Sequence, residues 1–156
     1  MIVLGLDPGT ERSALVELRD GEVKFAEILE NEKMLRLLEA TRPLNLSLAV
    51  LVIEQFESFG MPVGKDVFEA IFWSGRFAQA WGGRFEMLPR RQVKLHLCND
   101  SRGKDSNVRA ALIDRYGGQE ATRKGGALCE VHKDSWSALA LCTVWLDRQS
   151  KEMARG

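Results

Sequence analysis

The sequence predicts an α/β protein with a five-stranded mixed β-sheet that is covered by helices on both faces. Five short apolar runs bounded by turn residues indicate the strands, and segments with apolar residues at helical spacing alternate with the later runs. The run at residues 48–53 is apolar at every position, which is typical of a strand buried on both faces. At 156 residues the chain is long enough to bury a substantial core, and we expect residues 1–156 to form a single domain.

The expected strands follow from apolar runs and the turn residues between them. Pro8-Gly9 closes the first run, and Asp20-Gly21 between the second and third predicts a two-residue hairpin. The fourth is the buried central strand, and the fifth follows the longest predicted helix of the middle region. The expected strands are residues 2–7, 13–18, 22–29, 48–53 and 85–88.

Helices are expected where apolar residues recur at helical spacing. Asn31 has the side chain of a capping residue and is expected to cap the first helix, which Pro43 ends. The second helix is rich in aromatic residues, which we expect to lie mostly in the core, or in a dimer interface if they are exposed. Glycine pairs indicate a mobile loop at residues 117–130. The expected helices are residues 31–40, 66–81, 90–97, 106–116 and 134–148.

The composition indicates a soluble, cytoplasmic protein without a membrane partner. Apolar residues make up 45% and charged residues 28% of the chain, which is ordinary for a globular protein. Apolar runs stay well short of the roughly 18 residues that a membrane span needs, and the N-terminus lacks the pattern of a secretory signal. Three cysteines without a Cys-x-x-Cys pair favour reduced thiols over a disulfide framework.

Charge is distributed unevenly along the chain, although the net charge is zero. Residues 1–83 contain eight Lys or Arg against thirteen Asp or Glu, whereas residues 84–124 contain ten Lys or Arg against five Asp or Glu. A basic segment of this kind can form a phosphate-binding face, or simply a solvated surface. The distribution therefore permits a nucleic-acid partner without establishing one.

Three carboxylates lie where they could form a metal site. Asp7 ends the first apolar strand, Glu54 directly follows the central one, and Asp134 begins the last helix. Each alone has a simpler explanation, as a turn residue, a solvent-facing strand end and a helix cap respectively. If they converge, they repel one another unless a divalent cation neutralises them. Oxygen ligands suit Mg²⁺ or Mn²⁺, and a pair of such ions can hydrolyse a phosphodiester.

The motifs around these carboxylates resemble the three-part signature of RuvC-type Holliday-junction resolvases. Residues 4–10 read Leu-Gly-Leu-Asp-Pro-Gly-Thr, residues 52–55 read Val-Ile-Glu-Gln, and residues 134–141 read Asp-Ser-Trp-Ser-Ala-Leu-Ala-Leu. Their order and spacing agree with the family over nearly the whole chain, and residues 95–116 are similar to phage-encoded members.

The resemblance implies a fold, an activity and a partner. The fold is RNase H-like, and the activity is nicking of four-way DNA junctions with Mg²⁺, for which Mn²⁺ can substitute. The resemblance implies that Asp7, Glu54 and Asp134 are the catalytic metal ligands. It also implies a homodimer formed through the aromatic helix at residues 66–81.

The sequence departs from the family pattern in the last motif. The family has a second acid three residues after the position of Asp134, where this chain has Ser137. A hydroxyl is a poor Mg²⁺ ligand, so one ion would be held weakly or through water. We expect His132 to assist catalysis as a ligand, a proton shuttle or a phosphate contact. A loop histidine without a role is the alternative.

The residues that contact DNA are expected among the basic side chains after residue 90. Phe56 and Phe59 follow the predicted catalytic glutamate, where the family has an aromatic residue that wedges against junction bases. Core packing is the simpler explanation for both. The expected phosphate contacts are Lys94, Arg102, Lys104, Arg109, Arg123 and Lys124.

The sequence thus predicts a Mg²⁺-dependent endonuclease that resolves Holliday junctions and other branched DNA by paired nicking. Two alternatives stay open. A nuclease on the same fold could act on flaps, forks or R-loops, because substrate choice depends on the geometry of the dimer. A branched-DNA binding protein with little or no catalysis would result if Ser137 abolishes cleavage, although buried acids without a metal are costly to keep.

Overall fold

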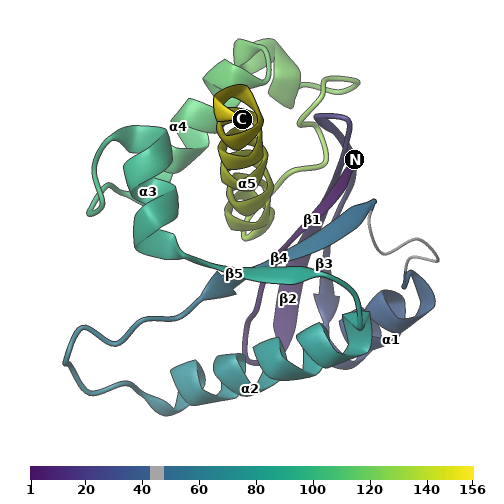
Figure 1. Ribbon diagram of the computed structural model, residues 1–156, viewed down its shortest axis with the longest axis vertical. Helices are drawn as coiled ribbons and strands as arrows, with labels where there is room; N and C mark the ends of the chain where they lie inside the picture. The colour runs from purple at the N-terminus through teal and green to yellow at the C-terminus, as the bar shows by residue number, and fades with distance from the viewer. Residues whose placement is uncertain (43–47) are drawn as a thin grey trace.

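The computed structural model describes residues 1–42 and 48–156, and its centre is a five-stranded mixed sheet (Figure 1). The strands are β1 (Ile2–Asp7), β2 (Arg12–Arg19), β3 (Glu22–Glu30), β4 (Ala49–Gln55) and β5 (Phe85–Pro89). Their spatial order is β3-β2-β1-β4-β5. β1 pairs antiparallel with β2 and β2 with β3, whereas β1, β4 and β5 run parallel. The carboxyl ends of the three parallel strands therefore meet at one edge of the sheet.

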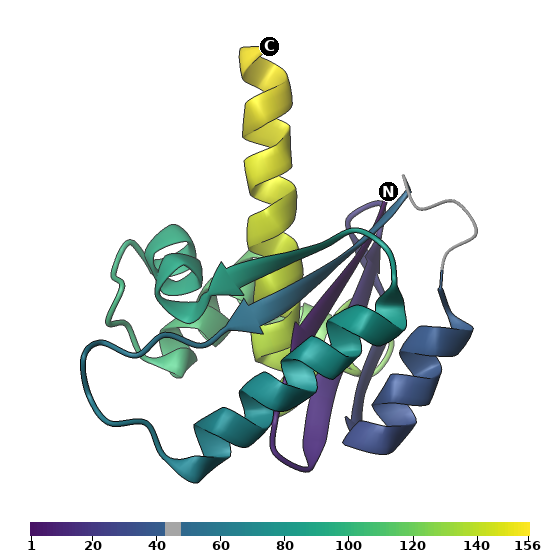
Figure 2. The same cartoon turned by 60° about the horizontal axis from the view of Figure 1, so that its bottom comes forward.

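Helices cover both faces of this sheet, as the sequence predicted (Figures 1 and 2). They are α1 (Asn31–Ala40), α2 (Lys65–Trp81), α3 (Arg90–Cys98), α4 (Asp105–Arg115) and α5 (Ser135–Arg155), with a short 3₁₀ helix η1 (Gly118–Thr122). α1 and α2 lie on one face, and α5 lies on the other with α3 and α4 beside it. Within the described ranges, no helix combines the length and the apolar character needed to cross a membrane.

The core is divided into two layers because side chains alternate along each strand. In β4, Val52 packs in the layer under α5, and Ile53 packs in the layer under α1 and α2. β1 alternates in the same phase, with Val3 under α5 and Leu6 on the opposite side. Both central strands are buried on both faces, which explains why their sequences are apolar runs without a polar stripe.

Close contact between α5 and β1 depends on Gly5. A Cβ atom at this position would lie 2.0 Å from the carbonyl oxygen of Ala138 in α5. That distance is far inside van der Waals contact, so any larger side chain would push the helix off the strand. Gly5 therefore sets α5 directly over β1 and brings the first turn of the helix toward the end of that strand.

The hairpin and the strand bounds agree with the sequence prediction to within two residues. Asp20 and Gly21 have φ angles of 53° and 85°, which are the left-handed values that a type I′ turn requires. The last helix runs further than expected, to Arg155 rather than Arg148. The expected helix end at Pro43 lies outside the described residues.

The predicted capping role of Asn31 is wrong. Glu30 occupies the N-cap position, and Asn31 is the first helical residue. Its buried side chain instead accepts a hydrogen bond from Ser13 Oγ at 2.6 Å and donates one to the carbonyl oxygen of Gly9 at 3.0 Å. Ser13 Oγ in turn accepts a hydrogen bond from the backbone amide of Gly9 at 3.1 Å. This network fixes the turn that follows Asp7.

The glycine-rich stretch at residues 117–130 is more structured than the mobile loop that the sequence predicted. It contains η1, and the amide of Leu128 donates to the carbonyl oxygen of Ala121 at 2.8 Å. Both side chains are buried in the layer under α5. The apolar residues between the glycines therefore anchor this segment, and the glycines supply its turns.

Candidate active site

Asp7 and Glu54 come together at the carboxyl edge of the parallel strands. β1 and β4 pair in register with Leu6 opposite Ile53, so the next residue of each strand is a carboxylate. The period of two then turns both carboxylates toward the α5 side of the sheet. Glu54 is only 5% exposed. Strand register alone therefore brings two acids together at the base of α5.

Burial next to Glu54 raises the pKa of Asp7 to about 9. Burial is the largest cause, followed by the hydrogen bond with Glu54 and the charge of that neighbouring carboxylate. The charge of Asp134 raises the pKa further, whereas Arg90 lowers it. The pair holds a proton at neutral pH, so it is a site where added positive charge would be favourable.

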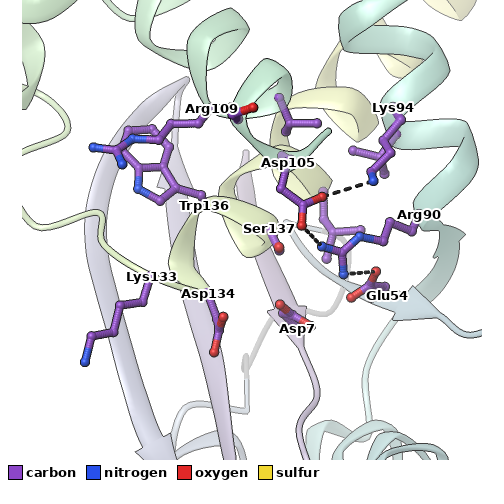
Figure 3. A pocket seen from close by; sticks show the side chains of 15 residues that line it. Asp7, Glu54, Arg90, Lys94, Asp105, Arg109, Lys133, Asp134, Trp136 and Ser137 are labelled. Carbon is purple, nitrogen blue, oxygen red and sulfur yellow. Dashed lines mark hydrogen bonds and ion pairs between the residues drawn. The ribbon is translucent and has the colours of Figure 1, made fainter. Parts of the chain in front are cut away.

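Asp134 stands at the start of α5, in the N-cap position. Its carboxylate makes no capping hydrogen bond within the described part of the chain, which weakens the explanation of this residue as a helix cap. The side chain lines the same cavity as Asp7 and Glu54 (Figure 3). The N-terminus of a helix favours negative charge, so this position suits a carboxylate.

The three acids line a cavity of about 370 Å³ whose other wall is formed by α3 and α4 (Figure 3). On that wall Arg90 reaches across to Glu54, with 3.3 Å between Nη1 and Oε1. Arg90 Nη2 also lies 2.8 Å from Asp105 Oδ2, and Lys94 Nζ lies 3.0 Å from Asp105 Oδ1. The cavity is therefore acidic on the strand side and ion-paired on the helix side.

Two of the three acids could together supply ligands to a divalent metal ion. Asp7 and Glu54 offer hard oxygen ligands, and burial together with the neighbouring Glu54 raises the pKa of Asp7 although Arg90 lowers it. In the described residues, however, no three Asp, Glu, His or Cys side chains are grouped closely enough to hold an ion together. Asp134 lines the cavity, and Ser137 lines it where the RuvC-type pattern has a second acid. The geometry fits a metal held by Asp7 and Glu54, with Asp134 available to approach.

The expected DNA contacts fall into three groups. Lys94 and Arg109 line the cavity itself, and the Arg109 guanidinium lies 5.0 Å from the ring centroid of Trp136. Arg102 lines a neighbouring cavity, and Lys104 immediately precedes α4. Outside both cavities are Arg123, which pairs with Glu120 at 2.6 Å, and Lys124. Only the first group is brought beside the acids.

His132 is exposed and does not line the cavity. Its Nδ1 lies 2.7 Å from the carbonyl oxygen of Glu130, two residues earlier in the same turn. The structure therefore places His132 near the start of α5 without directing it at Asp7 or Glu54.

The expectation that Phe56 and Phe59 pack in the core is wrong for Phe59, which is 66% exposed, whereas Phe56 is half-buried. Both line a second cavity of about 720 Å³ that shares Glu54, Arg90 and Lys94 with the first. The Arg91 guanidinium lies 5.8 Å from the Phe59 ring centroid. Aromatic and cationic side chains thus continue from the acidic site along one surface.

Arg90 and Asp105 were missed as site residues by sequence reasoning. Arg90 directly follows β5, whose carboxyl end lies beside that of β4, with Glu54 opposite Leu88. Knowledge of the strand order would have identified Arg90, because it begins its helix at the same edge. Asp105 belongs to a separate helix, and no spacing in the sequence indicates that α4 packs against α3.

Aromatic residues of α2 separate into two sets. Phe77 and Trp81 are buried in the core, whereas Phe68 and Phe72 are 61% and 66% exposed. The exposed set continues to the edge strand β5, where a groove of about 490 Å³ lies between helix and strand. Apolar residues that line it include Phe56, Ile71, Phe85 and Met87. This exposed apolar surface over α2 and β5 is called the α2 face below.

No protein-family model matches the sequence, and no curated protein matches it significantly. Solved structures do resemble it. RuvC from Thermus thermophilus has a TM-score of 0.60 at 18% identity, covering 91% of each chain. The same protein in complex with a Holliday junction substrate gives 0.57 at 18% identity over 91% of this chain and 90% of that one. The fowlpox virus Holliday junction resolvase gives 0.53 at 14% identity over 95% and 99% of the two chains.

These similarities define the fold. The chain has the RNase H-like fold of the RuvC-type resolvases, and the resemblance predicted from the motifs is confirmed at that level. The likeness extends over nearly the full length of each chain.

Proposed function

We propose that this protein is a divalent-metal-dependent endonuclease that resolves Holliday junctions and other branched DNA by paired phosphodiester nicking. The observation that carries the proposal is the pair formed by the half-buried Asp7 and the buried Glu54, set in a cavity whose opposite wall carries cations. Two acids in one buried site need a cation, and a cation there would face the surface on which a phosphate backbone can lie.

In this proposal Asp7, Glu54 and Asp134 hold Mg²⁺, with Mn²⁺ as a substitute. When bound, the metal supplies an activated water and stabilises the leaving oxygen of the phosphodiester. Asp7 must give up its proton before it can act as a ligand, because burial beside Glu54 holds that proton in the metal-free protein. Asp134 is exposed at the mouth of the cavity and would complete the ligand set from the α5 side.

The basic side chains around the cavity are proposed to hold the DNA backbone. Lys94 and Arg109 lie closest to the acids and would contact the phosphates that flank the cut. Arg102 and Lys104 would extend the contact along α3 and α4, and Arg123 and Lys124 would reach a more distant arm. We further propose that His132 contacts a phosphate, since its position outside the cavity suits that role better than ligation.

Paired nicking requires two sites at a fixed separation, and we propose that the α2 face joins two copies of the chain. A cluster of exposed Phe side chains next to an apolar groove is costly in water and is suited to a self-complementary contact. α2 lies on the opposite face of the sheet from α5, so a dimer contact made through α2 would leave the α5 side of each cavity open to DNA.

The test is cleavage of labelled four-way, forked, flapped and linear DNA in Mg²⁺, Mn²⁺ or EDTA. We expect symmetric paired nicks in the four-way junction, with metal only. Preference for forks or flaps would retain the site and change the substrate. Tight binding of junctions with no cutting in either metal would favour a non-catalytic binding protein, the alternative supported by Ser137 and by the absence of a three-acid group in the described residues.

A further inference from the structure

Arg90 occupies a position in the cavity where a metal ion would compete with it for Glu54. It begins α3 at the carboxyl edge of the sheet, and its guanidinium faces Glu54 at 3.3 Å. An arginine side chain keeps its charge in proteins, so the guanidinium supplies the positive charge that faces the acidic pair.

Asp105, in α4 on the helix side of the cavity, contacts the same guanidinium. Its Oδ2 lies 2.8 Å from Arg90 Nη2, a shorter contact than the one with Glu54, and its Oδ1 binds Lys94 at 3.0 Å. Burial would raise the pKa of Asp105, but the hydrogen bonds from Lys94 and Arg90 lower it, so this carboxylate is ionised. Arg90 is thus shared between a carboxylate that belongs to the acidic pair and one that does not.

We propose that Arg90 is an internal counter-ion that competes with the divalent cation for Glu54, and that Asp105 is the positioning residue that limits this competition. The inference rests on the proposed metal site at Asp7 and Glu54. A metal ion that binds Glu54 must displace the Arg90 N–H, and Asp105 offers the released guanidinium a partner that it already contacts. Arg90 moves toward Asp105 and stays in the cavity, where it can face the phosphate.

This arrangement predicts opposite effects for the two partners of the ion pair. Without Arg90, the acidic pair lacks its internal cation and binds a metal more tightly. Without Asp105, the guanidinium has Glu54 as its principal partner and the metal binds more weakly. The second effect requires Arg90, whereas a simple loss of negative charge at Asp105 would act whether or not Arg90 is present.

The experiment is calorimetric titration of Mn²⁺ into the metal-free, full-length protein without DNA. Arg90→Gln is expected to tighten Mn²⁺ binding about tenfold, which is about 1.4 kcal/mol. Arg91→Gln is the matched control, since it removes the same charge from the next residue of α3, and Arg91 makes no ion pair within the described residues. We expect it to change the affinity less than about twofold, because exposed charges are screened.

Asp105→Asn is expected to weaken Mn²⁺ binding about fivefold in the wild-type background and to have little effect in the Arg90→Gln background. An affinity for Arg90→Gln that equals or falls below that of the wild type would overturn the competition. An equal loss from Asp105→Asn in both backgrounds would overturn its action through Arg90.

The proposed metal site is tested separately in the same titration by Asp7→Asn. If that variant binds Mn²⁺ as well as the wild type does, the site assignment fails, and the inference that rests on it fails too. If Asp7→Asn abolishes binding while Arg90→Gln leaves it unchanged, the metal site stands and only the role of Arg90 is refuted.

Discussion

The cavity at the carboxyl edge of the sheet and the α2 face on the opposite side depart from ordinary protein surfaces in opposite ways. In the cavity, acids that prefer water are buried together, and the pKa of Asp7 rises to about 9 as a consequence. On the α2 face, Phe68 and Phe72 prefer burial and are 61% and 66% exposed. In the isolated chain, the side chains of each region therefore lie in an environment that is unfavourable for them.

The difference indicates what each region needs. A buried pair of carboxylates is relieved by positive charge, whereas an exposed apolar face is relieved by another apolar surface. The first requirement suits a metal ion. The second suits another copy of the same chain. Variants that change the acidic pair and leave the α2 face intact, or the reverse, test whether the two regions act independently.

The largest effect is expected from neutralising the acidic pair. Asp7→Asn or Glu54→Gln should lower junction cleavage by about a thousandfold or more, because several kcal/mol of metal-dependent stabilisation are lost. Junction binding should be unchanged or stronger, since each variant removes a negative charge that faces DNA. Cleavage rates and gel-shift affinities measure the two effects separately.

Asp114→Asn is the control for these variants, because Asp114 is an exposed acid of α4 that does not line the cavity. It should cut at the wild-type rate. If Glu54→Gln cuts at the wild-type rate, the cavity is not the site of cleavage, and the role of the acidic pair is unexplained.

The acidic side of the cavity could be predicted from sequence because it depends on strand ends. Asp7 and Glu54 each terminate an apolar run, and parallel neighbours bring such residues to one edge. The ion-paired side could not be predicted, because Arg90 and Asp105 belong to different helices and meet only through tertiary packing.

On the α2 face, too, the features that depend on tertiary packing could not be predicted from the sequence. Helical spacing identified the aromatic residues of α2 but did not separate the buried Phe77 from the exposed Phe72. That separation depends on where α1 and β5 lie against the helix. The capping prediction for Asn31 failed for a related reason, since its amide is engaged by Ser13 and Gly9 from a distant turn.

The next largest effect concerns the α2 face. Phe72→Glu should weaken self-association by about a hundredfold, because a charge placed in an apolar contact loses its hydration without gaining a partner. Sedimentation measures the shift, and the two nicks in one junction should become uncoupled while single nicks persist. Met153→Glu near the end of α5 is the matched control, as it also places a charge at an exposed apolar position. A Phe72→Glu variant that associates as the wild type does would place the interface elsewhere.

A pH-dependent stability is expected from Asp7 in the metal-free protein. Its pKa rises from 3.8 unfolded to about 9 folded, so between these values the folded state binds an extra proton. The free energy of unfolding must therefore fall as pH rises through this window, by up to about 1.4 kcal/mol per pH unit. Urea denaturation in EDTA from about pH 5 to about pH 8 measures the slope.

Asp7→Asn should remove this pH dependence and stabilise the metal-free protein at the upper end of the range. Asp114→Asn should retain the slope. If the free energy of unfolding depends on pH in the same way for the wild type and Asp7→Asn, the carboxylates of Asp7 and Glu54 are not coupled in solution.

The smallest effect is expected from a single phosphate contact. Arg109→Gln should weaken junction binding severalfold and reduce the slope of log affinity against log salt by about one. The Arg109 guanidinium lies over Trp136 at the cavity, so its loss should not disturb the sheet. An unchanged salt slope would show that Arg109 does not contact a phosphate.

The most direct test of the metal site is a crystal of the protein grown with Mn²⁺ and measured for anomalous scattering. We predict an anomalous peak between the carboxylates of Asp7 and Glu54, with Arg90 withdrawn toward Asp105. Mn²⁺ density elsewhere in the molecule, with no anomalous peak between these two carboxylates, would contradict this prediction.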